Sequence, residues 1–172
     1  MNLIKIADYI SVLPLCLYYV LSYLIVIDIK KIKNKLEYSV LLLGLIFSSI
    51  LVKYIKGINF NGDFIYRPKG AQYCDYLSKN KVAKVRGFPS GHMSSIALFA
   101  TFMILLRFRK YKNIKNYIKN EYIFILINVL LIILTGWARY YKKCHTDLQI
   151  LCGTVLGILL GYIFYEIYDR IN

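Results

Sequence analysis

Residues 122–137 of the chain read YIFILINVLLIILTGW, a run without a single charged side chain. A bilayer-spanning helix needs roughly 20 predominantly apolar residues, so this run is close to a complete crossing. The whole chain has the same character, because 58% of its 172 residues are hydrophobic and its mean hydropathy is +0.50. The apolar residues gather into long runs and do not recur at the spacing of a soluble core. The sequence therefore predicts a polytopic membrane protein.

Further apolar segments lie on both sides of this run. We expect them at about 9–27, from 38 to 52 or 55, from 92 to 106 or 108, and at 148–165. The second and third segments are short for a crossing unless Lys53 and Arg107 reach outward to the headgroups. The first is too long for a signal peptide and precedes a basic run, so we expect it to be retained. The predicted fold class is an all-α, polytopic membrane helix bundle with about five transmembrane helices.

The charge of the chain is strongly positive, with 23 Lys and Arg against 9 Asp and Glu and a formal net charge of +14. In a soluble protein this would favour nucleic acid as a partner. Here the cations lie between apolar runs, where they set topology and meet anionic headgroups, so we expect a membrane and no nucleic acid. The positive-inside rule places the short basic loops near 28–37 and 107–121 in the cytoplasm. With five spans, the loops that hold the two histidines would face the lumen or the cell exterior.

The connection at residues 56–91 is the one long loop, and long loops in compact proteins are usually functional. At its centre lies Arg67-Pro68, which by itself is typical of any positively charged loop. At its end the chain reads GFPSGHMSS, residues 87–95. Pro89 and Ser90 suit a helix start, and the free amides of a first helical turn bind anions.

Within this stretch, Gly91 would let the backbone approach a ligand closely, and His92 would lie beside a bound anion. A nearby negative charge favours the imidazolium form, which can donate a proton. The alternative interpretation is that Ser90 only caps the helix and that His92 is an interfacial histidine.

The second histidine lies in ARYYKKCHTDLQ, residues 138–149, between the fourth and fifth apolar segments. Arg139 can form two parallel hydrogen bonds to phosphoryl oxygens. Gln149 follows His145 at i+4, so its carbonyl oxygen can accept from one ring nitrogen and leave the other free to attack. Asp147 is expected to point away from this face.

All these polar segments fall on one membrane face in the five-span topology. Ionisable groups near spans are costly and tend to mark sites. Two histidines, two arginines and a helix N-terminus form a phosphate site, and a nucleophile with a separate proton donor makes it reactive.

In order and spacing, these segments resemble the type 2 phosphatidic acid phosphatase superfamily of membrane lipid phosphatases. Its motifs K-x6-R-P, P-S-G-H and S-R-x5-H-x3-D would correspond here to Arg67-Pro68, to residues 89–92, and to Arg139 with His145. The resemblance implies one membrane phosphatase domain over residues 1–172, with its catalytic motifs within 53–153. It implies removal of phosphate from a lipid phosphate, without a metal or other cofactor.

The resemblance also implies residue roles. His145 would attack phosphorus to give a phosphohistidine, and His92 would protonate the leaving oxygen. The phosphoryl oxygens would be held by Arg67, Arg139, Ser90 and the Gly91 amide.

The chain departs from the family pattern at three positions. The motif lysine would fall at Phe60, so Lys56, or else Lys53, must take its place. Ala138 replaces the serine before Arg139, and Gln149 replaces the aspartate behind His145. The sequence HTDLQ resembles the H-T-x-x-Q of dolichyl diphosphate phosphatases, which tilts the expected substrate toward a polyprenyl diphosphate. Two alternatives stay open: a catalytically inactive lipid-binding membrane protein, and a lipid phosphotransferase that uses the same site.

The four cysteines divide into two kinds. Cys16 and Cys152 lie within spans, where free cysteine behaves as a small hydrophobe. Cys74 and Cys144 lie on the predicted outer face beside the site, where an oxidising compartment would permit a disulfide. We hypothesise that they pair and tie the long loop to His145; the alternative is two unrelated cysteines.

Overall fold

The computed structural model of the chain describes residues 3–27, 32–71, 74, 86–111 and 113–172. Its helices are α1 (Leu3–Ile27), α2 (Ile32–Gly57), α3 (Gly91–Phe108), α4 (Ile114–Tyr141) and α5 (Asp147–Ile171), and a short 3₁₀ helix, η1, covers Asp63–Ile65. Five helices are long and apolar enough to cross a membrane, and the described residues contain no strand beyond one isolated bridge. The predicted fold class, an all-α bundle of about five transmembrane helices, is confirmed.

Several helices are longer than the apolar segments predicted from the sequence. The helix α2 begins at Ile32, inside the basic run expected to be a loop, and its candidate span covers Lys35–Gly57. The helix α4 begins at Ile114, but Glu121 interrupts it with φ −118° and ψ 15°, so its regular part begins where the apolar run does. These helices continue beyond their apolar segments into polar residues. Such residues are tolerated at the membrane surface because lysine and arginine side chains can extend to the headgroups. Hydropathy alone therefore underestimates each helix.

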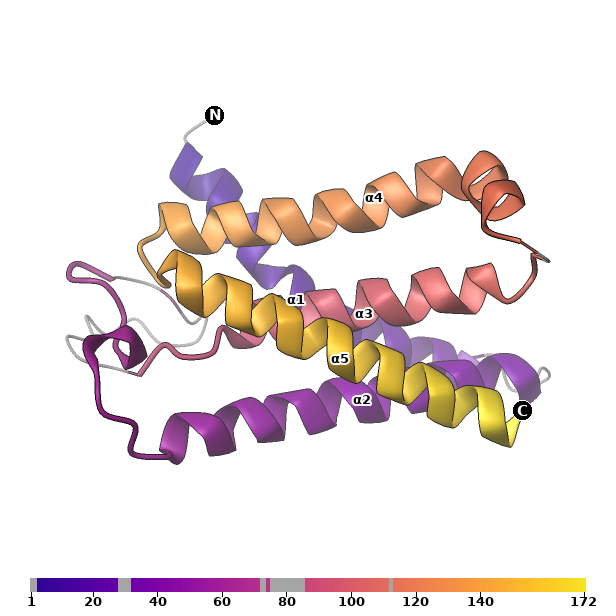
Figure 1. Ribbon diagram of the computed structural model, residues 1–172, viewed down its shortest axis with the longest axis horizontal. Helices are drawn as coiled ribbons and strands as arrows, with labels where there is room; N and C mark the ends of the chain where they lie inside the picture. The colour runs from indigo at the N-terminus through magenta and orange to yellow at the C-terminus, as the bar shows by residue number, and fades with distance from the viewer. Residues whose placement is uncertain (1–2, 28–31, 72–73, 75–85, 112) are drawn as a thin grey trace.

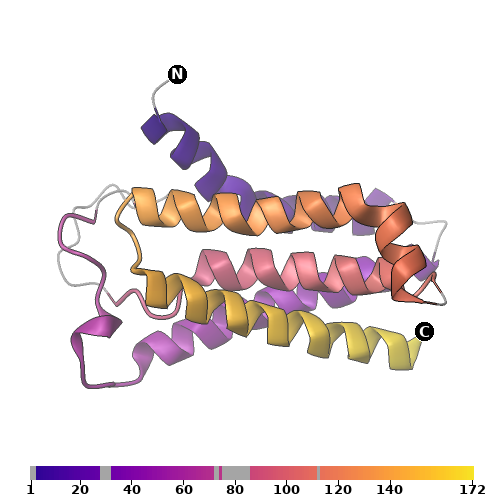
Figure 2. The same cartoon turned by 45° about the horizontal axis from the view of Figure 1, so that its top comes forward.

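The helix α3 lies at the centre of the bundle and packs against all four other long helices (Figures 1 and 2). Its closest partner is α5, which approaches through a stripe of glycines four residues apart, Gly153, Gly157 and Gly161. A Cβ atom at Gly157 would collide with the Ser94 carbonyl, and one at Gly161 would lie 2.7 Å from the Leu98 carbonyl oxygen. Small residues at such spacing allow helix backbones in membranes to approach closely. The stripe therefore fixes the start of α3 against the start of α5.

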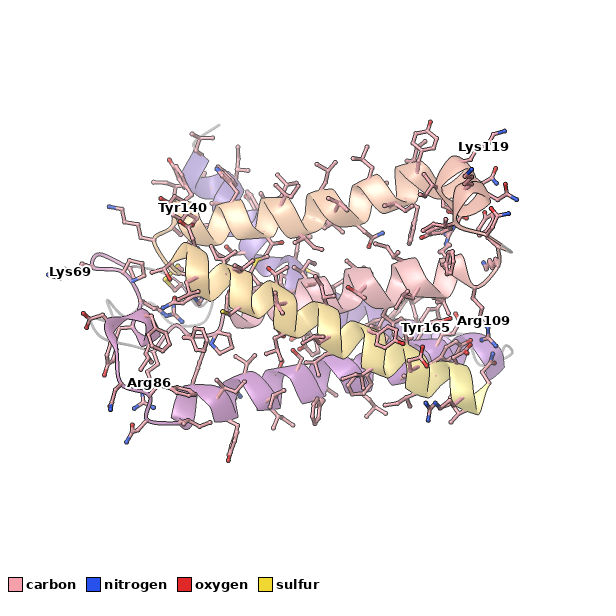
Figure 3. The ribbon with its side chains drawn as sticks, in the orientation of Figure 1. Lys69, Arg86, Arg109, Lys119, Tyr140 and Tyr165 are labelled. Atoms are coloured by element: carbon pink, nitrogen blue, oxygen red, sulfur yellow. A yellow bond between two sulfur atoms is a disulfide. The ribbon has the colours of Figure 1, made fainter. Side chains whose placement is uncertain are left out.

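The two ends of the bundle are polar and the surface between them is apolar. Figure 3 labels Lys69 and Arg86 at one end and Arg109 and Lys119 at the other. Between these ends the outward side chains are large hydrophobes such as Leu43 and Ile133, each more than half exposed. This distribution is the one expected of a helix bundle surrounded by lipid. The loop before α5, η1 and the start of α3 all lie at the Arg86 end (Figure 1).

Candidate active site

Backbone hydrogen bonds join the three polar segments that the sequence singled out. The amide of Gly87 donates to the Ile65 carbonyl at 2.7 Å, which attaches the start of GFPSGH to η1. The amide of Ser90 donates to the Gln149 carbonyl at 3.0 Å, which attaches the start of α3 to the start of α5. Segments that are distant in sequence therefore form one site, as the prediction of a single membrane face requires.

His145 lies directly before α5, whose N-cap is Thr146, and only 2% of its surface is exposed. Its Nδ1 lies 3.1 Å from the side-chain oxygen of Gln149. The side-chain nitrogen of Gln149, Nε2, donates to the carbonyl oxygens of Phe64 at 2.7 Å and Tyr66 at 2.8 Å. Since only the NH₂ group can donate to carbonyls, these bonds fix the orientation of the amide and turn its oxygen toward His145. Nδ1 then carries the ring proton, and Nε2 keeps its lone pair.

The pKa of His145 lies well below the usual histidine value. Burial of the ring is the largest cause, and the positive charges of Arg139, Arg67 and Lys56 act in the same direction. The hydrogen bond to Gln149 raises the pKa but does not outweigh these effects. His145 is therefore neutral near pH 7, the form in which a ring nitrogen can act as a nucleophile.

A cavity of about 270 Å³ lies beside the two histidines. His92, His145, Gly91 and Arg67 form part of its wall, as the sequence predicted. Among the described residues, no carboxylate lines it. A pocket bounded by cations and by the first turn of a helix is suited to an anion.

Both candidate lysines line this cavity from α2. Lys56 also lowers the pKa of His145, whereas Lys53 has no such effect, so Lys56 is the better match to the motif lysine. Phe60, at the motif position itself, packs edge-on against Phe88 with ring centroids 6.3 Å apart. Lys56, the candidate for the motif lysine, therefore lies in the last turn of α2, before the loop that holds Phe60.

Arg139 and Ser90 are buried and are not among the residues that line the cavity. Arg139 is fully buried, and its Nη2 donates to the Cys74 carbonyl at 2.7 Å. The hydroxyl of Ser90 is buried and makes no hydrogen bond within the described part of the chain. Ser90 is the N-cap of α3 by position, but its side chain does not cap the helix. The alternative interpretation, that Ser90 only caps the helix, is not supported, because its hydroxyl makes no capping hydrogen bond.

Cys74 and Cys144 form a disulfide, with S–S 2.15 Å and Cα–Cα 5.4 Å, so the hypothesised pairing is confirmed. The disulfide joins the long loop to the residue before His145. Cys16 and Cys152 are free, also as predicted. Asp147 is exposed, whereas Gln149 two residues later is buried. Among the described residues, no three His, Cys, Asp or Glu side chains gather in a way that could hold a metal ion.

Sequence reasoning missed two parts of the site. The first is Gly87, where a Cβ atom would collide with the Gln149 oxygen and lie 2.9 Å from Cγ of Arg67. The second is Arg86, whose Nη1 donates to the Lys56 carbonyl at 2.7 Å and holds the end of α2 against the loop. A glycine directly before the Pro-Ser-Gly-His motif was a visible signal for the first. Nothing in the sequence indicated that Arg86 would bind the Lys56 carbonyl.

Comparison with known proteins identifies the family of the chain. The sequence profile of the PAP2 superfamily matches residues 11–172. The chain is also similar to Dolichyldiphosphatase 1 of Dictyostelium discoideum, with 30% identity over 87 residues, which are 49% of this chain and 37% of that protein. The match thus spans little more than a third of that relative's length. No solved structure matches the chain. Because the profile covers nearly the whole sequence, including all three polar segments, this integral membrane helix bundle belongs to the PAP2 superfamily.

Proposed function

We propose that this protein is a membrane phosphohydrolase that removes phosphate from a lipid phosphate or polyprenyl diphosphate through a phosphohistidine at His145. One observation carries the proposal above all others. Gln149 holds Nδ1 of His145 as the donor, so Nε2 remains as an unprotonated nucleophile at a cation-lined cavity. An inactive lipid-binding protein would not require a buried histidine in this state.

In the proposed reaction, Nε2 of His145 attacks phosphorus and forms an N–P bond. The bond between phosphorus and the leaving oxygen breaks, and His92, held as the imidazolium by the bound phosphate, gives that oxygen its proton. Water then attacks phosphorus and its proton passes to the neutral His92, while the N–P bond breaks with its electron pair returning to Nε2, and inorganic phosphate leaves. For a monoester the first product is a lipid alcohol, and for a diphosphate it is a lipid monophosphate.

The proposed phosphate contacts come from two directions. Arg67, Lys56 and the Gly91 amide border the cavity and can meet the phosphoryl oxygens at once. Arg139 and the buried Ser90 hydroxyl, which do not line it, supply charge and a donor. Preorganised donors around a developing charge are the main means by which phosphoryl transfer is accelerated. No metal or other cofactor takes part in this scheme, which predicts activity in EDTA.

The family and the relative support the substrate class. PAP2 membership supports a phosphate substrate, and the name of the Dictyostelium relative supports a polyprenyl diphosphate. We propose that residues 1–172 act as one phosphatase domain. We further propose that the active site faces the lumenal or extracytoplasmic side, because the disulfide beside His145 is of a kind that persists in oxidising compartments.

The test is phosphate release by the purified protein in detergent with EDTA, on a panel of phosphatidic acid and polyprenyl diphosphates. Wild type should release phosphate, and His145→Ala should abolish release while remaining monodisperse in detergent. Asp147→Asn is the matched control, since it changes an exposed side chain two residues away. Release that survives His145→Ala would refute the nucleophile, and no release from any member of the panel would favour the inactive alternative.

A further inference from the structure

Two lysines of α2 line the cavity beside the histidines, but only Lys56 has a role in the proposed phosphate contacts. Lys53 lies three residues earlier, almost one helical turn, so both side chains project from the same face of α2. Lys53 also falls inside the candidate span Lys35–Gly57. A charged side chain within a span is costly and tends to mark a functional site. Lys53 is therefore expected to have an anionic partner.

The described part of the chain does not supply that partner. Among the described residues, no carboxylate pairs with Lys53 and none lines the cavity. Asp8, the one acidic residue of α1, pairs instead with Lys142, whose Nζ lies 2.6 Å from the carboxylate. An anion that enters the cavity would compensate the charge of Lys53.

Two hydroxyls of the cavity wall already use their protons within the protein. The Tyr18 hydroxyl donates to the Leu45 carbonyl at 2.9 Å. In the 2.6 Å bond between the side-chain oxygens of Tyr18 and Ser49, the donor is then Ser49. An anion in this part of the cavity would therefore take its hydrogen bonds from Lys53.

The two lysines lie at different distances from the nucleophile. The charge of Lys56 lowers the pKa of His145, whereas the charge of Lys53 is not among the causes of that shift. Because the Coulomb interaction weakens with distance, the ammonium group of Lys53 lies farther from His145. The cavity thus has cations in two places, with Lys56 and Arg67 beside the histidine and Lys53 farther away. A substrate with two linked phosphates matches this arrangement.

We infer that Lys53 binds the second phosphate of a diphosphate substrate, the one that stays on the lipid, while Lys56 and Arg67 bind the phosphate that is transferred. This inference rests on the proposed function and deepens it, because it makes Lys53 the residue that distinguishes diphosphates from monophosphates. When Nε2 of His145 attacks the terminal phosphorus, the bond to the bridging oxygen breaks, that oxygen takes the proton of His92, and the lipid monophosphate leaves. Lys53 stabilises the negative charge of this leaving phosphate. A monophosphate has no group in that place.

The first test compares two substrates that differ by one phosphate. Initial rates of phosphate release are measured on farnesyl diphosphate and farnesyl phosphate in mixed micelles, and kcat/KM for the first is divided by kcat/KM for the second. In Lys53→Gln this ratio should fall about tenfold or more, because a charged hydrogen bond to only one of the substrates is lost. Lys56→Gln should lower both values and leave the ratio near that of wild type.

Lys69→Gln is the matched control, because Lys69 is an exposed lysine at the same end of the bundle and outside the cavity (Figure 3). It removes the same charge and should leave the ratio unchanged. An unchanged ratio in Lys53→Gln, or an equal fall in Lys69→Gln, would overturn the inference.

The second test measures binding and not hydrolysis. Farnesyl methylenediphosphonate has carbon in place of the bridging oxygen, so the bond between its phosphorus groups is not cleaved, and farnesylphosphonate lacks the second phosphorus. The Kd of the diphosphonate should rise about tenfold in Lys53→Gln, while the Kd of the monophosphonate stays unchanged. An unchanged Kd of the diphosphonate, or equal changes for both ligands, would contradict the inference. If wild type hydrolyses neither farnesyl substrate, the proposed function fails, while this comparison still decides whether Lys53 recognises a second phosphate.

Discussion

The side-chain oxygen of Gln149 lies 3.1 Å from Nδ1 of His145, and the nitrogen of the same amide donates to two carbonyls of the loop that carries Arg67. Gln149 therefore connects the proposed nucleophile to the proposed phosphate clamp. A carboxylate here would turn a second oxygen toward the carbonyls of Phe64 and Tyr66, which repel it. Gln149 makes both contacts because an amide side chain both accepts and donates, whereas a carboxylate only accepts.

The first prediction concerns this amide. Gln149→Glu keeps the shape of the side chain but removes both hydrogen bonds to the loop, so the imidazole loses its fixed orientation. We expect kcat/KM to fall about 100-fold, the scale of a 1 Å misplacement. Asp147→Asn, an exposed neighbour, should leave phosphate release unchanged. Higher activity in Gln149→Glu would contradict this prediction, because it would mean that a carboxylate behind His145 works better than the amide.

The second prediction concerns Gly87. An alanine methyl would displace the Gln149 oxygen and press on the Arg67 stem, so Gly87→Ala should lower kcat/KM about tenfold or more. Nothing lies within 4 Å of a Cβ atom at Gly57, which makes Gly57→Ala the control with no expected effect. Equal activities of the two variants would show that Gly87 is not needed for the site.

The third prediction concerns the disulfide. Cys74 accepts a hydrogen bond from Arg139 through its carbonyl, and Cys144 precedes His145, so reduction should release two parts of the site together. The crosslink closes a separation of 70 residues, and loss of a native disulfide typically costs about 2–5 kcal/mol. Reductant should lower both Tm and phosphate release. Cys74→Ser should show the same losses without reductant, whereas Cys16→Ala should behave as wild type; insensitivity of wild type would refute the role.

The fourth prediction concerns pH. The depressed pKa of His145 keeps the nucleophile neutral, so the acid limb of kcat/KM, which reports the free enzyme, should lie below the usual histidine value of about 6.5. Lys56→Gln removes a positive charge that disfavours the imidazolium. The pKa of His145 should then rise, and the acid limb should move to higher pH. A limb that stays in place in Lys56→Gln would argue that another group titrates.

The fifth prediction concerns the glycine stripe. Gly157→Ile would force α5 away from the backbone of α3, where even a Cβ atom would lie 2.8 Å from Cβ of Ala97. Overpacking of this kind costs about 1–3 kcal/mol, so Tm in detergent should fall. Leu159→Ile, on the exposed face of the same helix, should leave Tm unchanged. A similar Tm for both variants would mean that the close approach is dispensable.

The sequence was sufficient for the fold class and for several of the residues that line the cavity beside the histidines. Hydrophobic runs located all five candidate membrane spans of the described residues, because long apolar runs without charged side chains are typical of bilayer-spanning helices. The i+4 spacing predicted the bond between His145 and Gln149, because residues four apart share a helical face. His145 itself precedes the helix, yet the N-cap geometry at Thr146 brings the same two side chains together.

The remaining features depend on contacts between distant segments. Nothing local in the sequence of Phe64 and Tyr66 shows that their carbonyls accept from Gln149, since every residue carries such a group. The contribution of α1 to the cavity wall was equally hidden, because Leu15 and Tyr18 resemble any other lipid-facing residues until the cavity is seen. The glycine stripe was readable in LQILCGTVLGILLGY, residues 148–162, but its partner helix was not.

The central claim is that His145 becomes covalently phosphorylated, and trapping that species tests it most directly. Wild-type protein in EDTA is mixed with substrate carrying ³²P in the phosphate to be transferred, quenched in alkali, which preserves phosphohistidine, digested and mapped by mass spectrometry. The account predicts phosphate on the peptide that contains His145, present during turnover, lost on acid treatment and absent in His145→Ala. Phosphate on another residue, or steady release of phosphate without any labelled peptide under rapid quenching, would contradict it.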